Sequence, residues 1–308
     1  MNYLELVNKA IFEAGVDLDD LTSGTFAAPA STKMYTHFKQ WVADAWEDIQ
    51  LDHNEWQFVS ANAVVQINPR ILVKNGNRAT APAAGYTYTS ASGGVSFTIV
   101  SQSLLSGTWA GGTARAVLDI STIGGTGNFI LLENYSELTP TPAANKFTFE
   151  FYGRYDLAAM VTDLGVAQVG SFSIQDEEGG SNTLTYVPWA LWVEQGYELM
   201  YNIRGMPLFF TQTPDGQYDF YPRPERTYTL AFTYIKDQSV LSAYSDIPTG
   251  LPDKYHRAIM WLAVMYYANY DEKDNVWKRA SLKYNKYMAA MERDLSQKAT
   301  FGASIYDE

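Results

Sequence analysis

Hydrophobic residues recur every three or four positions at both ends of the chain, which is the pattern of amphipathic helices. Near the N-terminus this pattern covers residues 3–14, and Gly15 follows as a C-terminal stop. A longer helix is predicted over residues 31–50. Near the C-terminus the spacing predicts two further long helices, over residues 255–270 and 274–295. The two ends of the chain are therefore expected to be helical.

Between these helices the hydrophobic period shortens towards two, as it does in β-strands. Only seven residues between positions 71 and 148 are charged, and ten of the 22 glycines lie there. Short runs rich in β-branched and aromatic residues alternate with Gly, Ser and Asn turns, which is typical of an antiparallel sandwich or small barrel. We therefore predict a β-rich insertion over residues 68–148.

The segment after the insertion mixes both patterns. Strands are predicted over 147–152 and 166–174, followed by a helical block from Pro188 to Gly205. A hairpin and a third strand are predicted over 207–221 and 227–235. The sequence thus predicts an α+β fold, with a helical bundle core, a small antiparallel β element and a β-rich insertion domain. The predicted parts are 1–67 (N-terminal part of the core), 68–148 (insertion), 149–298 (β element and C-terminal helices) and 299–308 (an extended tail).

Charge changes the expectation about partners. The formal net charge is −12, and a nucleic-acid reader usually presents a basic face. Residues 1–56 carry ten acids and three bases, whereas residues 251–308 carry eight acids and nine bases. The acidic and near-neutral ends could attract one another or meet different partners. Asp44, Glu47 and Asp48 fall on one face of the second helix, where we expect a solvated acidic surface in preference to a metal or catalytic site.

Motifs for catalysis or cofactors are weak throughout. The chain has no cysteine and three widely spaced histidines, so we expect no metal site and no cofactor. Gly124-Gly125-Thr126-Gly127 lacks the Lys-Ser/Thr of a phosphate loop and is better explained as a turn. Glu133 and Glu137 are the carboxylates that a glycosidase reading would use, and such close pairs are common by chance. We expect a protein that is not an enzyme.

No secretory signal pattern and no apolar run long enough to span a bilayer is evident. We therefore expect a protein made and folded in a cytoplasm, without a membrane partner.

Several short runs, taken in order, resemble tailed-phage head-to-tail adaptor proteins, including the tail tubular or gatekeeper type of short-tailed phages. The resemblance covers roughly residues 1–66 and 150–298, and the insertion departs from it. The runs are Trp46-Glu47-Asp48-Ile49-Gln50, Trp56-Gln57-Phe58, Gly205-Met206-Pro207-Leu208-Phe209-Phe210-Thr211, Asp215-Gly216, Tyr221-Pro222-Arg223-Pro224 and Leu251-Pro252-Asp253-Lys254-Tyr255.

Membership of that family would imply a virion protein of the head–tail junction, assembled in the host cytoplasm. It would form a ring of twelve copies beneath the portal protein, with DNA passing through a central channel without specific binding. Tail, tail-tube or nozzle proteins would attach below. The resemblance implies that the C-terminal tail contacts the portal, for which Phe301, Ile305 and Tyr306 are the candidates. Asp44, Glu47 and Asp48 are the candidates for an acidic channel wall, which would repel DNA phosphates.

The leading hypothesis is accordingly a structural head-to-tail adaptor. The alternative is a neck or tail-completion protein, or a virion component that binds a host glycan through the β-rich insertion. A cell-wall glycosidase ranks third.

Overall fold

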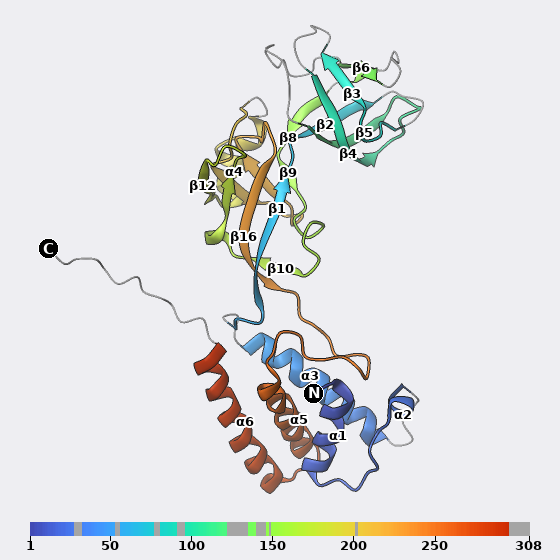
Figure 1. Ribbon diagram of the computed structural model, residues 1–308, viewed down its shortest axis with the longest axis vertical. Helices are drawn as coiled ribbons and strands as arrows, with labels where there is room; N and C mark the ends of the chain where they lie inside the picture. The colour runs from blue at the N-terminus through green and yellow to red at the C-terminus, as the bar shows by residue number, and fades with distance from the viewer. Residues whose placement is uncertain are drawn as a thin grey trace, which may run out of the picture. The chain divides into compact units, whose positions relative to one another are not determined.

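The structure is a computed structural model, which describes residues 1–27, 33–52, 56–76, 81–90, 96–121, 135–139, 146–147, 149–200 and 203–295 (Figure 1). It contains both α-helices and antiparallel sheets, so the predicted α+β class is confirmed. The chain divides into two compact units. One, the helical unit, comprises the described residues of Met1–Ala61 and Ile235–Glu308, and the other, the strand unit, comprises those of Asn62–Tyr234.

These units group residues differently from the parts inferred from the sequence. Residues 149–234, which the sequence placed in one part with the C-terminal helices, lie in the strand unit together with the β-rich region. The limits at residues 67, 148 and 298 describe a finer division and stay predictions.

The four long helices of the helical unit begin and end close to where hydrophobic periodicity placed them. The helices of this unit are α1 (Tyr3–Ala14), α2 (Ser23–Ala27), α3 (Lys33–Asp52), the short 3-10 helix η3 (Asp253–Tyr255), α5 (His256–Tyr270) and α6 (Asp274–Leu295). The short helices α2 and η3 were not predicted. A capping box formed by Asn2 and Glu5 starts α1. Gly15 ends α1 with φ of 70°, a left-handed conformation that glycine adopts without steric cost. The glycine stop predicted from the sequence is confirmed.

One hydrophobic core holds these helices together. Helix α5 contacts α1, α3 and α6, and ten of its 15 residues are buried. Large aromatic side chains fill the core, among them Phe38, Trp46, Trp56 and Tyr267. Burying each of these rings removes a large apolar area from water and stabilises the unit by several kcal/mol, about 1.5–3 for a side chain of phenylalanine size.

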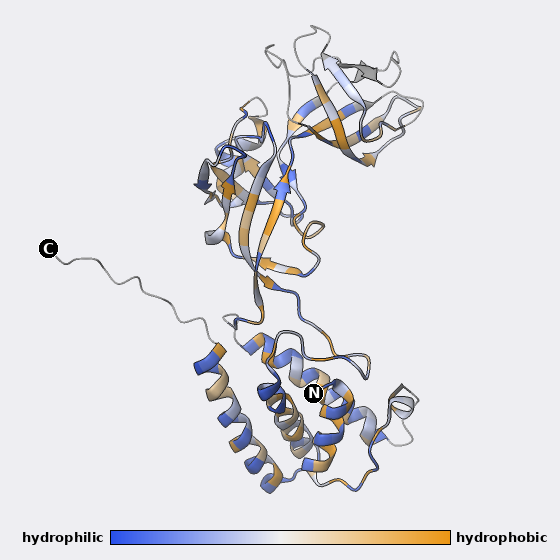
Figure 2. Ribbon diagram, in the orientation of Figure 1, coloured by the Kyte–Doolittle hydropathy of each residue, from blue (hydrophilic) through white to orange (hydrophobic). Residues whose placement is uncertain are grey.

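Helix α6 packs more lightly. Only Ala280, Met288 and Met291 are buried among its 22 residues. Figure 2 shows hydrophilic and apolar stretches alternating along α6, the amphipathic pattern of a helix with one packed side. Most of the α6 surface is therefore available to other contacts.

A buried histidine at the start of α5 has polar partners at both ring nitrogens. His256 Nε2 donates to the carbonyl oxygen of Leu251 at 2.8 Å, and Nδ1 lies 2.8 Å from the Met1 amino group. Burial, the largest cause, and the nearby positive charge hold the pKa of His256 below its ordinary value of 6.5, although Asp253 opposes this shift. The imidazole is therefore neutral in the folded protein at neutral pH.

Replacing His256 with glutamine should make the helical unit less sensitive to mild acid. Below the ordinary histidine pKa the unfolded chain binds a proton that the folded chain resists, so the wild type loses stability as pH falls from about 6.5 towards the folded-state pKa. The loss from this group is at most about 1.4 kcal/mol per pH unit. Urea unfolding of wild type and His256→Gln at pH 7.5 and 5.5 measures it. Equal losses in the two proteins would contradict the expectation.

The strand unit contains three sheets. The first has the order β1-β16-β11-β12, with β10 also paired to β16, and uses β1 (Ser60–Ile67), β10 (Leu164–Ala167), β11 (Ser173–Gln175), β12 (Ser181–Thr183) and β16 (Tyr228–Lys236). The second has the order β13-β14-β15-β9, and uses β9 (Arg154–Tyr155), β13 (Thr185–Tyr186), β14 (Phe209–Gln212) and β15 (Tyr218–Tyr221). Strands β14 and β15 form the predicted antiparallel hairpin, with Gln212 opposite Tyr218.

The third sheet is a small barrel. Its order is β7-β6-β3-β4-β5-β2-β8, formed by β2 (Arg70–Gly76), β3 (Thr87–Ser90), β4 (Ser96–Ser106), β5 (Ala114–Ile120), β6 (Tyr135–Thr139), β7 (Lys146–Phe147) and β8 (Phe149–Tyr152). The strands at its two ends, β7 and β8, follow each other in the chain with one residue between them, so the sheet closes on itself. Its own core includes Tyr88, Phe97, Trp109 and Phe151.

The helical block predicted over 188–205 is wrong in length. The α-helix α4 covers only Trp189–Glu194, and a 3-10 turn, η2 (Tyr197–Leu199), follows it. Gly196 adopts φ of 71° between them and so ends the α-helix after six residues. The apolar residues that the sequence placed on one helical face consequently separate, with Trp192 buried and Met200 and Ile203 exposed.

Candidate interaction surfaces

The acidic residues singled out from the sequence lie on α3 and are not simply solvated. Asp44 and Asp48 are four residues apart and so lie on one side of the helix, where Asp52 continues the row. Asp48 accepts a hydrogen bond from the Tyr266 hydroxyl of α5, and Asp44 accepts one from Gln40 at 2.7 Å. We call Asp44, Asp48 and Asp52 the acidic row. Glu47 is half-buried and stands at the edge of this row.

Two tyrosines from neighbouring helices face the acidic row. Burial is the largest cause of a raised pKa at Tyr266, and its hydrogen bond to Asp48 adds to the effect. Burial, followed by the charges of Asp52 and Asp48, raises the pKa of Tyr284 on α6 to about 12. Both phenols therefore keep their protons at neutral pH and can act as hydrogen-bond donors. The acidic row thus borders α5 and α6 as well as solvent.

Basic residues gather in a groove elsewhere on the helical unit. Two adjoining pockets, each about 400 Å3, share Lys254 and Tyr287. Six basic side chains line them, against the two carboxylates Asp253 and Asp294; the basic residues are Lys9, Lys254, Arg257, Lys283, Lys286 and Arg293. Lys254 contacts Asp294 at 2.9 Å and remains 62% exposed. We call this region the basic groove, and it is net positive in a protein whose total charge is −12.

A run of exposed apolar side chains follows β13 in the strand unit. They lie on α4, η2 and the segments around them, and are Leu191, Val193, Leu199, Met200, Ile203 and Leu208. Scattered apolar residues are ordinary on a protein surface, but clusters of this kind often mark protein contacts. The exposed fraction reaches 70% at Leu199.

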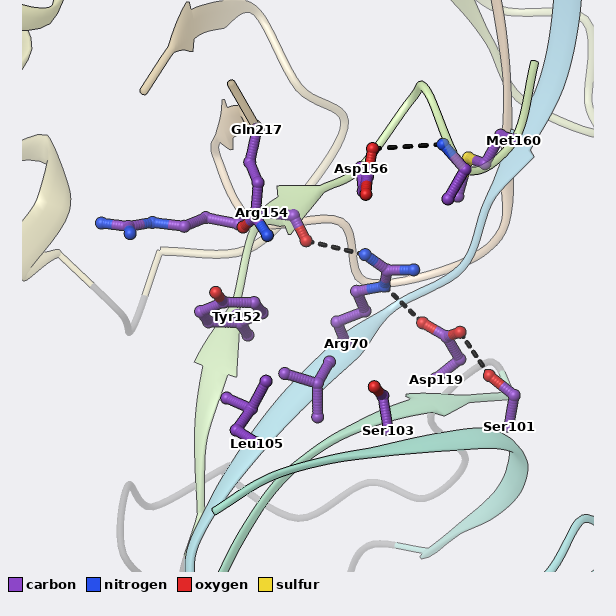
Figure 3. Close-up of a pocket in the computed structure, with 12 residues that line it drawn as sticks. Arg70, Ser101, Ser103, Leu105, Asp119, Tyr152, Arg154, Asp156, Met160 and Gln217 are labelled. Atoms are coloured by element: carbon purple, nitrogen blue, oxygen red, sulfur yellow. Dashed lines mark hydrogen bonds and ion pairs between the residues drawn. The ribbon is translucent and has the colours of Figure 1, made fainter. Parts of the chain in front are cut away.

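A polar pocket of about 310 Å3 lies where the barrel adjoins the second sheet (Figure 3). Arg70 at the start of β2 forms an ion pair with Asp119 of β5, and its Nη1 donates to the carbonyl oxygen of Arg154 at 2.8 Å. The guanidinium group also lies over the buried Tyr155 ring, 4.2 Å from its centroid. Arg70 therefore joins the barrel to β9 and forms one wall of the pocket.

The rest of the pocket mixes hydrogen-bond donors and acceptors. Ser101 donates to Asp119 at 2.5 Å, and Asp156 accepts from the Ala159 backbone at 3.1 Å. The hydroxyl of Tyr152, whose pKa is raised mainly by burial, stays protonated and also lines the pocket. Figure 3 shows Gln217 and Ser103 among the side chains at its edge.

Several candidate residues from the sequence lie outside the part of the chain that the structure describes. Phe301, Ile305 and Tyr306 fall beyond the described residues, as do Glu133 and the glycines at 124–127. Glu137 lies in β6. Within the described ranges, no group of three or more His, Asp or Glu is arranged to hold a metal ion, and no helix is long and apolar enough to cross a membrane.

Sequence reasoning missed the basic groove and the polar pocket. The basic residues come from α1, η3, α5 and α6, and only the packing of these helices brings them together. Arg70 and Asp119 are separated by 48 intervening positions in the insertion, and their pairing depends on the antiparallel register of β2 and β5. The excess of bases after residue 251 was the available signal for the groove.

Comparison with known proteins supports an adaptor. Residues 165–305 match the model of the family described as SU10 adaptor protein, just under half of the chain. No curated protein matches the chain. The matched segment covers the later strands, α5 and α6, and therefore reaches from the strand unit into the helical unit. The match supports a phage adaptor-type structural protein and a component of the virion, and that family is not known for enzymes.

Proposed function

We propose that this chain is the head-to-tail adaptor of a tailed phage, which forms a ring under the portal, lines the DNA channel and provides the site of tail attachment. The match of residues 165–305 to an adaptor family is the observation that carries this proposal. The helices of the helical unit would form the packed core of the ring, most simply with twelve copies. The exposed apolar side chains of residues 191–208 offer a surface for the portal or for tail and nozzle proteins.

Net negative charge suits a channel through which DNA slides. Repeating a chain of charge −12 around a ring concentrates negative potential, and this repels phosphates. Asp44, Glu47 and Asp48 are the channel candidates from the sequence, and Asp17, Asp19 and Asp20 are exposed carboxylates in the loop between α1 and α2. DNA would pass without specific binding.

The C-terminal tail is proposed to contact the portal through Phe301, Ile305 and Tyr306. These apolar residues are spaced along a short terminal segment, and segments of this kind often bind in a partner's groove.

Capture of the chain by its immobilised cognate portal tests the proposal. We expect the full chain to be retained and a chain lacking residues 299–308 to bind at least about tenfold more weakly, the effect of about 1.4 kcal/mol of lost contact. A variant with Phe301, Ile305 and Tyr306 replaced by serine separates side-chain contacts from chain length. Absence of portal binding by the full chain would contradict the adaptor role, and full binding by both variants would contradict only the role of the tail.

The polar pocket favours a second candidate, binding of a host glycan at the base of the barrel. Arg70 is paired with Asp119, and the pocket lining combines balanced charge with both hydrogen-bond donors and acceptors, a chemistry that suits the hydroxyls of a neutral sugar. The Tyr152 ring adds a partly apolar wall. The volume of about 310 Å3 is at the small end for a ligand pocket.

A glycan array probed with the full chain tests this second candidate. We expect binding that Asp156→Ala abolishes, because that change removes a carboxylate from the pocket wall. Asp237→Ala, at an exposed position in the helical unit, is the matched control and should leave binding unchanged. Equal binding by both variants, or none by the wild type, would rule the pocket out as a glycan site.

A further inference from the structure

The basic groove and the acidic row use different sides of helices α5 and α6. An α-helix turns by about 100° per residue, so Arg257 and Tyr266, nine residues apart on α5, point in opposite directions. Arg257 lines the basic groove, whereas Tyr266 donates to Asp48 of the acidic row. On α6, Tyr284 is about 100° from Lys283 and about 200° from Lys286, so it lies on a different side of the helix from these two groove residues. Lys286 lines the groove, whereas Tyr284 lies near Asp48 and Asp52, whose charges help to raise its pKa.

The helices that flank α5 agree with this arrangement. Helix α1 contributes Lys9 to the basic groove, and α3 carries the acidic row. Both α1 and α3 contact α5, while α6 packs on α5 and exposes most of its surface (Figure 1). The helical unit therefore has one positive face and one negative face.

The two faces also match in their apolar parts. Leu51 of α3 is 59% exposed and, one residue before Asp52 and three after Asp48, stands beside the acidic row. The basic groove has cationic side chains at its rim and includes Tyr255, Tyr287 and Ala290 among its lining residues. An apolar side chain flanked by carboxylates is the chemical counterpart of an apolar floor bordered by lysines.

We infer that the basic groove of one copy of this chain receives the acidic row of a second copy, with Leu51 inserted towards Tyr287. This inference rests on the proposed ring and names the surfaces that would build it. A contact between two different surfaces of identical chains is head-to-tail, and it produces a closed ring when the rotation between copies closes. It also assigns Asp44 and Asp48 to the contact between copies, and leaves Glu47 and the exposed Asp17, Asp19 and Asp20 for a channel wall.

Charge reversal of each surface tests the inference. The double variant Lys283→Glu, Lys286→Glu makes the groove repel the acidic row. The double variant Asp48→Lys, Asp52→Lys makes the row basic, so that it is repelled by the groove. We expect wild-type chains to associate in sedimentation experiments at about 50 mM salt and more weakly at about 500 mM, because salt screens such contacts. Each reversed protein alone should associate at least about tenfold more weakly. Mixing the two reversed proteins should restore association between them.

Matched variants separate surface from net charge. Lys33→Glu with Lys278→Glu changes the net charge equally at exposed positions outside the groove and should associate as wild type does. Leu51→Ala should weaken association without changing its dependence on salt, because it removes only the apolar contact. Far-UV circular dichroism verifies that every variant is folded. No rescue on mixing, or an equal loss in the control, would overturn the inference.

Competing occupants of the groove give different results. If the groove bound DNA phosphates, a duplex of about 30 base pairs would bind to wild type and not to Lys283→Glu with Lys286→Glu, while self-association stayed the same. That outcome would overturn the inference. Portal capture is measured on the same proteins: a chain that binds the portal as a lone copy and never self-associates contradicts the contact alone. A chain that self-associates through these faces without binding the portal contradicts the proposed function.

Discussion

Replacing Asp219 with alanine should lower the stability of the strand unit by about 3–5 kcal/mol, among the largest losses expected from one substitution. Asp219 on β15 pairs with Arg223, and the two side chains are 1% and 4% exposed. Arg223 also donates to the Phe220 carbonyl oxygen at 3.0 Å. Without the carboxylate a buried guanidinium loses its counter-charge, which is costly in a low-dielectric interior. Urea unfolding followed by circular dichroism measures the loss.

An exposed ion pair provides the control. Glu178, 79% exposed, contacts Arg226 at 3.3 Å, and Glu178→Gln should change stability by less than about 1 kcal/mol. Gly153→Ala disturbs the same buried pair sterically, since an added Cβ would stand 2.2 Å from Arg223 Nη1 and 2.8 Å from Asp219 Oδ1. We expect Gly153→Ala to destabilise the same unit strongly. Equal stability of Asp219→Ala and Glu178→Gln would refute the importance of the buried pair.

In the helical unit, Trp46→Ala should cost about 3–5 kcal/mol. The Trp46 side chain is fully buried, and its Nε1 donates to the Ser239 hydroxyl at 3.0 Å. The side chain of Gln50 binds the backbone of the same serine, because its Nε2 donates to the Ser239 carbonyl oxygen at 3.0 Å. The substitution leaves a cavity and removes a contact that fixes the chain before α5 to α3. Thermal and urea unfolding monitored by tryptophan fluorescence and circular dichroism measure it.

Two further tryptophan variants show how much of this loss comes from the hydrogen bond and how much from burial in the core. Trp46→Phe keeps most of the buried area and loses the hydrogen bond, so a loss of about 1–2 kcal/mol is expected. Trp277→Ala on α6, where the ring is 38% exposed, should cost less than Trp46→Ala. A comparable loss of stability in Trp46→Ala and Trp277→Ala would contradict the finding that Trp46 is buried in the core while Trp277 is partly exposed.

Hydrophobic spacing was sufficient to predict the long helices because each of them has an apolar side that packs into the core. Leu6, Val7 and Ile11 of α1 all point into one core, and Gly15 ends the helix with the backbone conformation that its lack of a side chain permits. The hairpin of β14 and β15 was predictable for a similar reason, since Pro214-Asp215-Gly216 specifies a tight turn.

Other features depend on contacts that spacing does not encode. The α4 segment has helical periodicity, yet Gly196 interrupts it and redirects the chain. The barrel depends on the pairing of β8 with β2, which lies far away in the sequence. The candidate surfaces divide in the same way. Asp44, Glu47 and Asp48 were recognisable as one acidic face, whereas the basic groove combines Lys9 with residues near the other end of the chain.

A single physical idea connects the proposed function with the charges on the helical unit. An acidic chain resists aggregation on DNA, and a localised basic groove gives copies of it one oriented way to meet. The adaptor match covers α5 and α6, which supply most of that groove. Assembly and free passage of DNA would then follow from the placement of charge on one helical unit.

Electron microscopy of the chain mixed with its cognate portal is the measurement that addresses this account most directly. We expect a ring of these chains beneath the portal, around an open channel, with the basic groove of each copy against the acidic row of its neighbour. Portals that remain bare, beside single chains at saturating concentration, would contradict the adaptor proposal.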